Sequence, residues 1–181
     1  MTATAHSRRA STSLRLIAGL LAALLLVPLA QAKKSDRDQP MAYQAKHTDA
    51  YNAPNTVTTL SGDVKITQGT MVLTGDKAEI HLDGDQQISQ VVVTGKPAHI
   101  QQLDDAGNLM AGDAATLAYD NLHGIAVLTG NAAVTQQNRG EFHGDKLTYN
   151  TQTSQITGDA GGDGLVHGVI LPKQKPATGG K

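Results

Sequence analysis

The sequence contains no cysteine and no tryptophan, and Phe142 is its only phenylalanine. Without cysteine there is no disulfide framework, so a chain of 181 residues has to be held together by burial of apolar side chains. Because aromatic residues are so few, the interior has to be built from Val, Ile, Leu, Ala and Met. The composition therefore predicts a smooth aliphatic interior, either a slender core or a cavity for aliphatic molecules.

Charge of one sign is nowhere concentrated. The chain has 15 basic and 16 acidic residues, which gives a formal net charge of −1 at pH 7. No run of like charges occurs, and no basic patch carries the aromatic partners on which bases stack. Proteins that bind nucleic acid generally show such a basic surface, so we expect no nucleic-acid partner.

The sequence also lacks the local signatures of chemistry. No Gly-x-Ser-x-Gly elbow is present, and the few aromatic side chains leave no platforms for sugars. The histidines beyond residue 32 are scattered, whereas zinc ligands usually come in close pairs; they are His47, His81, His99, His123, His143 and His167. We predict no metal, no cofactor and no catalytic residue, and we place a hydrolase last among the alternatives.

Residues 1–32 have the three parts of a secretory signal peptide. A basic start is followed by the apolar run from Leu16 to Leu29 and by the small-residue cleavage site Ala30-Gln31-Ala32. The run is shorter than the roughly 20 apolar residues that a membrane-spanning helix needs. Cleavage would remove three basic residues and no acidic residue, which leaves 149 residues with 12 basic against 16 acidic side chains, a net charge of −4.

The exported part suits one domain with polar ends. Residues 33–42 are charged, contain a proline and show no hydrophobic period, so they are predicted to be a flexible leader. Residues 172–181 are rich in Lys, Gly and Pro and are predicted to be a disordered tail. The domain between them is expected to span residues 43–171.

One motif returns three times between residues 59 and 150. Each copy starts with a Thr/Ser-Gly step and alternating apolar residues, and continues with a Gly-Asp step and further alternation. The copies are TLSGDVKITQ with LTGDKAEIHL, VTGKPAHIQQ with MAGDAATLAY, and LTGNAAVTQQ with FHGDKLTYNT. Self-similarity at this spacing predicts stacked units that bury their apolar faces against one another.

The hydrophobic period is two throughout, which predicts strands, and no segment has clean helical spacing. The apolar parity changes at each Gly-Asp step, which indicates a corner at Gly75, Asp76, Gly112, Asp113, Gly144 and Asp145. Each strand would pass there from one sheet into a second. The predicted fold is all-β: two facing antiparallel sheets in a repeat-built, jelly-roll-like body.

Several segments resemble one family. TTLSGDVKITQGTMVLTGDKAEI is similar to the opening repeat of the OstA-like (LptA) family of periplasmic lipopolysaccharide-transport proteins, VVVTGKPAHIQQ to its middle, and AVLTGNAAVTQQ with GDKLTYN to its later part. The resemblance extends from about residue 43 to residue 171. Single Thr-Gly motifs are weak signals, but three in order, with Gly-Lys-Pro-Ala and Gly-Asp-Lys between them, are specific.

The resemblance implies a twisted, open β-jelly roll in the periplasm, with an aliphatic groove for the acyl chains of lipopolysaccharide. It also implies a bridge between membranes. The N-terminal edge would pair with an inner-membrane partner of the same fold, the C-terminal edge with the outer-membrane translocon, and copies of the chain would stack head to tail. No energy source is expected in this subunit.

The period assigns a set of side chains to the groove, although simple core packing explains each of them equally well. The candidates are Val64, Ile66, Met71, Leu73, Ile80, Val93, Ile100, Leu117, Val127, Val134, Phe142, Leu147 and Tyr149. Two other functions remain open: the membrane-anchored receiving subunit of the same system, and a structural or adhesin-like β-repeat protein that binds no lipid.

Overall fold

The computed structural model describes residues 36–162 and 164–172, which form one 3₁₀ turn and ten strands. The predicted signal peptide and most of the predicted tail lie outside these residues. The elements are η1 (Asp36–Asp38), β1 (Met41–Gln44), β2 (His47–Asp49), β3 (Val57–Gln68), β4 (Met71–Leu82), β5 (Ile88–Leu103), β6 (Leu109–Asp120), β7 (Ile125–Gln136), β8 (Gly140–Asn150), β9 (Ile156–Asp159) and β10 (His167–Ile170).

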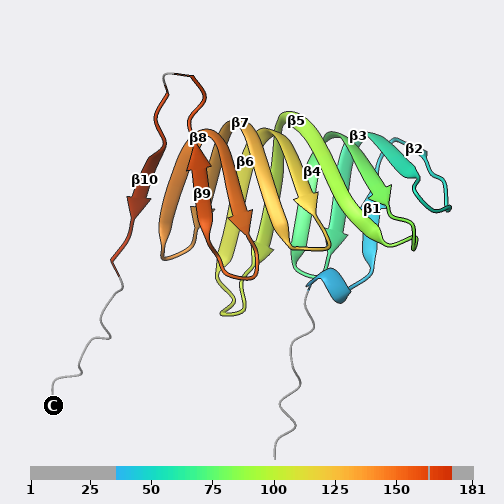
Figure 1. Cartoon of the computed structure of the whole chain (residues 1–181), viewed down its shortest axis with the longest axis horizontal. Helices are drawn as coiled ribbons and strands as arrows, with labels where there is room; N and C mark the ends of the chain where they lie inside the picture. Colours follow the sequence, from blue (N-terminus) through green and yellow to red (C-terminus); the bar gives the residue numbers. More distant parts are fainter. Residues whose placement is uncertain (1–35, 163, 173–181) are drawn as a thin grey trace, which may run out of the picture. The chain divides into compact units, whose positions relative to one another are not determined.

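All the strands belong to a single antiparallel sheet in the order β1-β3-β4-β5-β6-β7-β8-β10, with β2 also on β3 and β9 also on β8. From β3 to β8, strands that follow one another in the chain are neighbours in the sheet (Figure 1). The predicted all-β, repeat-built fold is confirmed. Within the described residues, no helix is long and apolar enough to cross a membrane.

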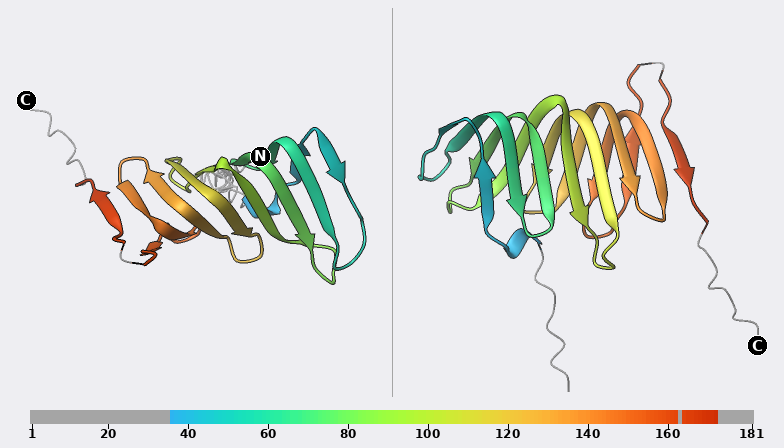
Figure 2. Two further views of the ribbon diagram at one scale, coloured as in Figure 1. Left: turned by 90° about the horizontal axis from the view of Figure 1, so that it is seen from above. Right: turned by 180° about the vertical axis from the view of Figure 1, so that it is seen from behind.

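Every long strand is interrupted near its middle. The pairing registers shift between Ser61 and Val64, between Thr74 and Lys77, and at the matching place in each later pair. These interruptions form a line across the sheet, along which it folds over (Figures 1 and 2). The predicted facing sheets are therefore the two halves of one continuous sheet.

We name these halves layer A and layer B. Layer A contains residues 57–61, 77–82, 88–94, 116–120, 125–129 and 146–150. Layer B contains residues 64–68, 71–75, 98–103, 109–114, 132–136 and 140–144. At the outer edges, β2 and β9 extend layer A, and β1 and β10 extend layer B.

The predicted corners relate to this line in different ways. Gly75-Asp76 and Gly144-Asp145 lie at register breaks, whereas Gly112 and Asp113 pair regularly and their strand breaks just after them, at residues 114–115. The opening steps of two repeats bend as well, which the hydrophobic pattern did not predict. Gly62-Asp63 and Gly130-Asn131 have φ between +49° and +83°, a backbone region that Gly, Asn and Asp tolerate better than other residues.

The predicted flexible leader is wrong for residues 36–42. Asp36 accepts hydrogen bonds from Thr70 and from Gln102 Nε2 (2.8 Å), and Gln68 Nε2 donates to two carbonyls of the leader. These bonds hold η1 against the sheet, and β1 then begins at Met41. The charged composition of the leader indicated flexibility. The prediction missed these hydrogen bonds because their partners lie far away in the sequence.

Candidate functional site

The interior between the layers is the candidate site, and from β3 to β8 it is aliphatic except for Tyr119 and Tyr149. Buried residues of both layers form one apolar cluster. At Gly112 in layer B, a Cβ atom would lie 2.7 Å from Leu128 Cδ2 in layer A, so the layers touch there directly. In this state the interior is a packed core whose buried side chains are each at most 6% exposed.

Most of the predicted groove residues are buried in this interior. Those that lie there are Val64, Ile66, Met71, Leu73, Ile80, Val93, Ile100, Leu117, Val134, Leu147 and Tyr149, each at most 6% exposed. Phe142 is half-buried and packs against the cluster from β8. The structure thus collects these side chains in one place, and whether they contact lipid is a proposal taken up below.

Val127 lies on the wrong face. Its strand turns Ala126 and Leu128 inward, and Val127 is half-buried on the outside. The segment Ile-Ala-Val-Leu is apolar on both faces, so alternation alone favoured the larger β-branched residues. Inward position was instead set by the pairing of Leu128 with Leu117 and Leu147, which are both buried.

The interior also contains buried residues that the predicted groove set does not include. They are Leu60, Ala78, Val91, Ala98, Met110, Ala114, Tyr119, Ala126, Leu128 and Ala132. Many are alanines, which carry a weak hydrophobic signal but allow the two layers to approach closely. Burial raises the pKa of Tyr119, so its phenol stays neutral at physiological pH.

η1 and the turns that connect the strands from β3 to β8 lie along the edge opposite the fold line, towards the bottom of Figure 1. We call this edge the mouth of the interior. Two polar contacts cross it: Arg37 donates to the carbonyl of Leu122, and Gln136 Nε2 donates to the carbonyl of Ser154 at 3.1 Å. Within the described part of the chain, these two are the polar contacts that join the layers across the mouth.

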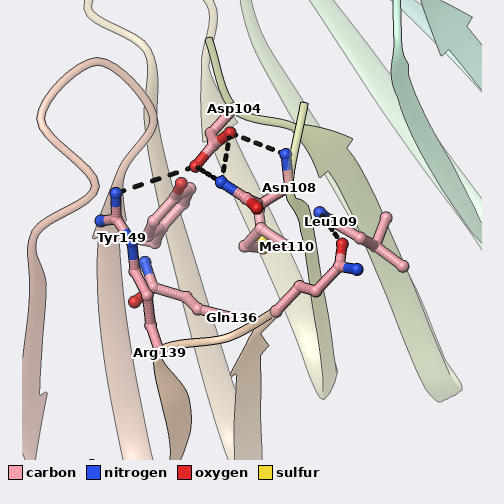
Figure 3. Close-up of a pocket in the computed structure, with 8 residues that line it drawn as sticks. Asp104, Asn108, Leu109, Met110, Gln136, Arg139 and Tyr149 are labelled. Carbon is pink, nitrogen blue, oxygen red and sulfur yellow. Dashed lines mark hydrogen bonds and ion pairs between the residues drawn. The ribbon is translucent and has the colours of Figure 1, made fainter. Parts of the chain in front are cut away.

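The mouth differs between its two ends. Near β1 it contains a cleft of about 510 Å³. Towards β8 it narrows to a cavity of about 10 Å³ above Met110 and Tyr149, closed by the β5–β6 turn (Figure 3). The mouth is therefore more open at the end that carries β1.

Asp104 organises that closing turn. Its carboxylate accepts from Asn108 Nδ2 and from the backbone N–H groups of Asn108 and Ala106, and it lies 3.8 Å from Arg139. Figure 3 shows how Asp104 faces Asn108 and Arg139. Burial alone would raise the pKa of Asp104, but these hydrogen bonds and the guanidinium outweigh it and hold the pKa below its ordinary value. At neutral pH the turn is thus fixed by a charged carboxylate.

Some ionisable side chains on the surface lie in pairs. His99 Nδ1 lies 2.9 Å from an oxygen of Asp113, and His123 Nδ1 lies 2.7 Å from one of Asp120. The pairing of Asp120 with backbone N–H groups and with His123 lowers its pKa, although burial acts the other way. Within residues 36–162 and 164–172, no three His, Asp or Glu side chains converge as metal ligands.

The two outer edges of the sheet are lightly covered. At one edge, β1 and β2 cover the two halves of β3, and at the other, β10 and β9 cover the two halves of β8. None of the residues of β10 is buried. Large apolar side chains are exposed around it: Leu165, Val166, Val169, Ile170 and Leu171.

One antiparallel sheet folded over an aliphatic interior, with lightly covered edges, defines the open β-jelly-roll class. Within that class, residues 44–155 match the model of the LptA/(LptD N-terminal domain) LPS transport protein family. The chain belongs to this family.

Individual relatives agree. The chain is 32% identical over 169 residues to the lipopolysaccharide export system protein LptA of Escherichia coli (strain K12), covering 93% of this chain and 89% of the relative. It is 33% identical over 171 residues to the export protein LptH of Pseudomonas aeruginosa, covering 90% and 96%. A crystal structure of LptH, the LptA-homologous periplasmic component of that organism's lipopolysaccharide transport device, matches with a TM-score of 0.68 at 28% identity, over 77% of this chain and all of LptH.

Proposed function

We propose that this protein carries lipopolysaccharide through the periplasm from the inner to the outer membrane, with the acyl chains of lipid A sheltered between layers A and B. The observation that carries the proposal is the aliphatic interior, which runs without interruption through every strand from β3 to β8. It occurs in a chain whose family and relatives bear the names of lipopolysaccharide export proteins.

The energetic need for such an interior is large. Transfer of one methylene between water and an apolar environment changes the free energy by about 0.8 kcal/mol. For a chain of about 12 carbons, exposure to water would therefore cost roughly 10 kcal/mol on that scale. An aliphatic groove removes most of this cost without any chemistry in the carrier, which agrees with relatives that are named as transport proteins rather than enzymes.

Loading requires a change of state, because the interior side chains now fill the space between the layers. Several of them, Ile66, Leu73 and Ile100 among them, are 0% exposed. We infer that the layers move apart at the mouth while the fold line stays closed. Acyl chains would then replace the contacts between apolar side chains of opposite layers. These side chains would stay buried, now against lipid.

The edges suggest how a bridge would be built. A strand edge with free N–H and C=O groups is a template for pairing with another chain, and a head-to-tail contact that does not close extends into a filament. We propose that the β1/β2 edge meets an inner-membrane partner of the same fold and the β9/β10 edge the outer-membrane translocon. Additional copies of the chain would stack between them, edge to edge.

Mass spectrometry of organic extracts from protein purified without detergent from the periplasm tests the carrier function. We expect stoichiometric lipid A. If no lipid is found, even after incubation with excess lipopolysaccharide, the interior is a plain core and the structural, adhesin-like alternative gains support. Sequencing of the exported N-terminus decides the other alternative: a start at Lys33 excludes the membrane-anchored subunit, and an uncleaved chain favours it.

A further inference from the structure

The cleft at the β1 end of the mouth has polar walls over an apolar floor. Its volume is about 510 Å³, within the range of small-molecule sites. Met41 and Ile88 line it and also pack against the apolar cluster. The floor of the cleft is therefore continuous with the interior between the layers.

Side-chain amides dominate the walls. Five carboxamides line the cleft, contributed by the N-terminal segment, by layer B and by two of the turns of layer A: Gln39, Gln68, Gln86, Gln87 and Asn121. The charged side chains that line it are Arg37 and Asp38, whose charges cancel. A ligand for these walls would accordingly be recognised by hydrogen bonds rather than by net charge.

Two of these amides carry acceptors that nothing in the described protein satisfies. Gln68 is 3% exposed, and its Nε2 donates to the carbonyls of Arg37 and Gln39, each at 3.2 Å. Asn121 Nδ2 donates to the carbonyl of Ile88 at 3.0 Å. These bonds fix the orientation of both amides, and within the described residues Gln68 Oε1 and Asn121 Oδ1 are buried without a partner.

A buried acceptor without a donor is unfavourable, and a ligand that brings a donor removes the penalty. Gln68 lies in layer B and Asn121 in the β6–β7 turn of layer A, and both residues line the cleft. Their unsatisfied oxygens become accessible when the layers move apart at the mouth, and a single ligand with several donors could then satisfy both. Hydroxyl and amide N–H groups are such donors, and they are closely spaced on an N-acylated amino sugar.

We propose that this cleft is the binding site for the sugar headgroup of the carried lipid. The headgroup donates hydroxyl and amide N–H groups to Gln68 Oε1 and Asn121 Oδ1, while its acyl chains continue past Met41 and Ile88 into the interior. This inference rests on the proposed carrier function for the identity of the lipid, but the recognition of the sugar rests on the cleft itself.

The test uses the mature chain and a soluble probe, an N-acetylated glucosamine disaccharide without acyl chains, followed by ¹H–¹⁵N correlation NMR. The side-chain NH₂ signals of Gln68 and Asn121 and the backbone signals of residues 86–88 should shift together on titration. Asn121→Ala and Gln87→Ala should each weaken binding at least about threefold, as expected for loss of one hydrogen bond. Gln90→Ala, which removes an exposed carboxamide outside the cleft, should leave it unchanged. The same spectra report whether each variant is folded.

Binding of a fluorescent fatty acid, measured in parallel, separates this inference from the carrier function. If the fatty acid binds but the disaccharide moves no cleft signal, or moves it equally in Asn121→Ala, the headgroup site is wrong and the carrier function stands. If the disaccharide binds as expected while neither fatty acid nor lipopolysaccharide enters the interior, the cleft is a sugar site and the carrier function fails.

Discussion

At the scale of single residues, the fold line depends on close approach between neighbouring backbones. A Cβ atom on Gly75 would lie 2.6 Å from Val93 Cγ1 and 2.7 Å from the carbonyl oxygen of Thr94. Both neighbours belong to β5, the next strand in the sheet, and one of the two atoms is backbone that cannot rotate away. Glycine is needed at this position for space, although its φ is ordinary.

We predict that Gly75→Ala lowers the free energy of unfolding by about 1–3 kcal/mol, the usual cost of overpacking. Gly84 is the matched control, because a Cβ there would meet nothing closer than 3.9 Å. Gly84→Ala should be neutral or stabilising by up to about 1 kcal/mol, since alanine has less freedom in the unfolded chain. Urea unfolding followed by circular dichroism measures both; equal losses would show that the fold line is not crowded.

A second pair of residues tests the face of β7 that the hydrophobic pattern assigned wrongly. Leu128 is 0% exposed between the layers, whereas Val127 is half-buried on the outside. Leu128→Ala should cost about 2–5 kcal/mol of stability, and Val127→Ala about 1 kcal/mol or less. The reverse order in urea unfolding would restore the face predicted from alternation.

At the scale of elements, the strands were predictable and their surroundings were not. Period-two alternation located β3 to β8, because each of these strands has one face in the core. It failed at residues 125–128, where both faces are apolar, and it could not foresee η1. That turn is held by Asp36 through partners 34 and 66 residues away, a distance that no local pattern records. For the same reason, the cleft between η1 and the layer A turns had no sequence signal.

The tether of η1 leads to a prediction. Asp36→Ala removes the hydrogen bonds from Thr70 and Gln102 and should free residues 37–40, with a loss of about 1–2 kcal/mol in stability. Amide hydrogen exchange should accelerate in this segment while the core strands remain protected. Asp38→Ala is the control, since Asp38 is exposed. Unchanged exchange in the Asp36 variant would mean that β1 alone holds the N-terminal segment.

At the scale of the whole described domain, the proposed loading requires the fold line to act as a hinge and the mouth to open. The absence of cysteine makes this testable, because Gln136→Cys and Ser154→Cys place the only two thiols on opposite sides of the mouth. We predict that a bifunctional thiosulfonate cross-linker between them blocks uptake of lipopolysaccharide and that reductant restores it. Each single-cysteine variant, treated identically, should load normally. Uptake by the cross-linked protein would show that lipid enters elsewhere, for example along the sheet edges.

The proposed assembly would take place at the two ends of the sheet, each of which carries two short strands. β10 pairs with residues 140–143 of β8 and buries none of its own side chains, so it is among the elements that open most easily. Its exposed Val169 and Ile170 would gain burial only against another molecule. We therefore predict that concentrated protein forms a ladder of oligomers and that deletion of residues 164–181 converts it to monomer, measured by light scattering.

A substitution separates the role of β10 from a general effect of truncation. Val169→Lys with Ile170→Lys keeps the chain length and the backbone of β10 but places charge on the surface that the next copy would cover. This variant should shift the ladder towards monomer as the deletion does, whereas Lys substitution at Leu122, which is also exposed but lies at the mouth, should not. A ladder that survives both changes at β10 would place the contact at another edge. The deletion leaves residues 140–143 of β8 as a free strand edge that could itself pair, so the double-lysine variant decides the role of β10. If the ladder survives in that variant too, the edge to examine is β1 with β2.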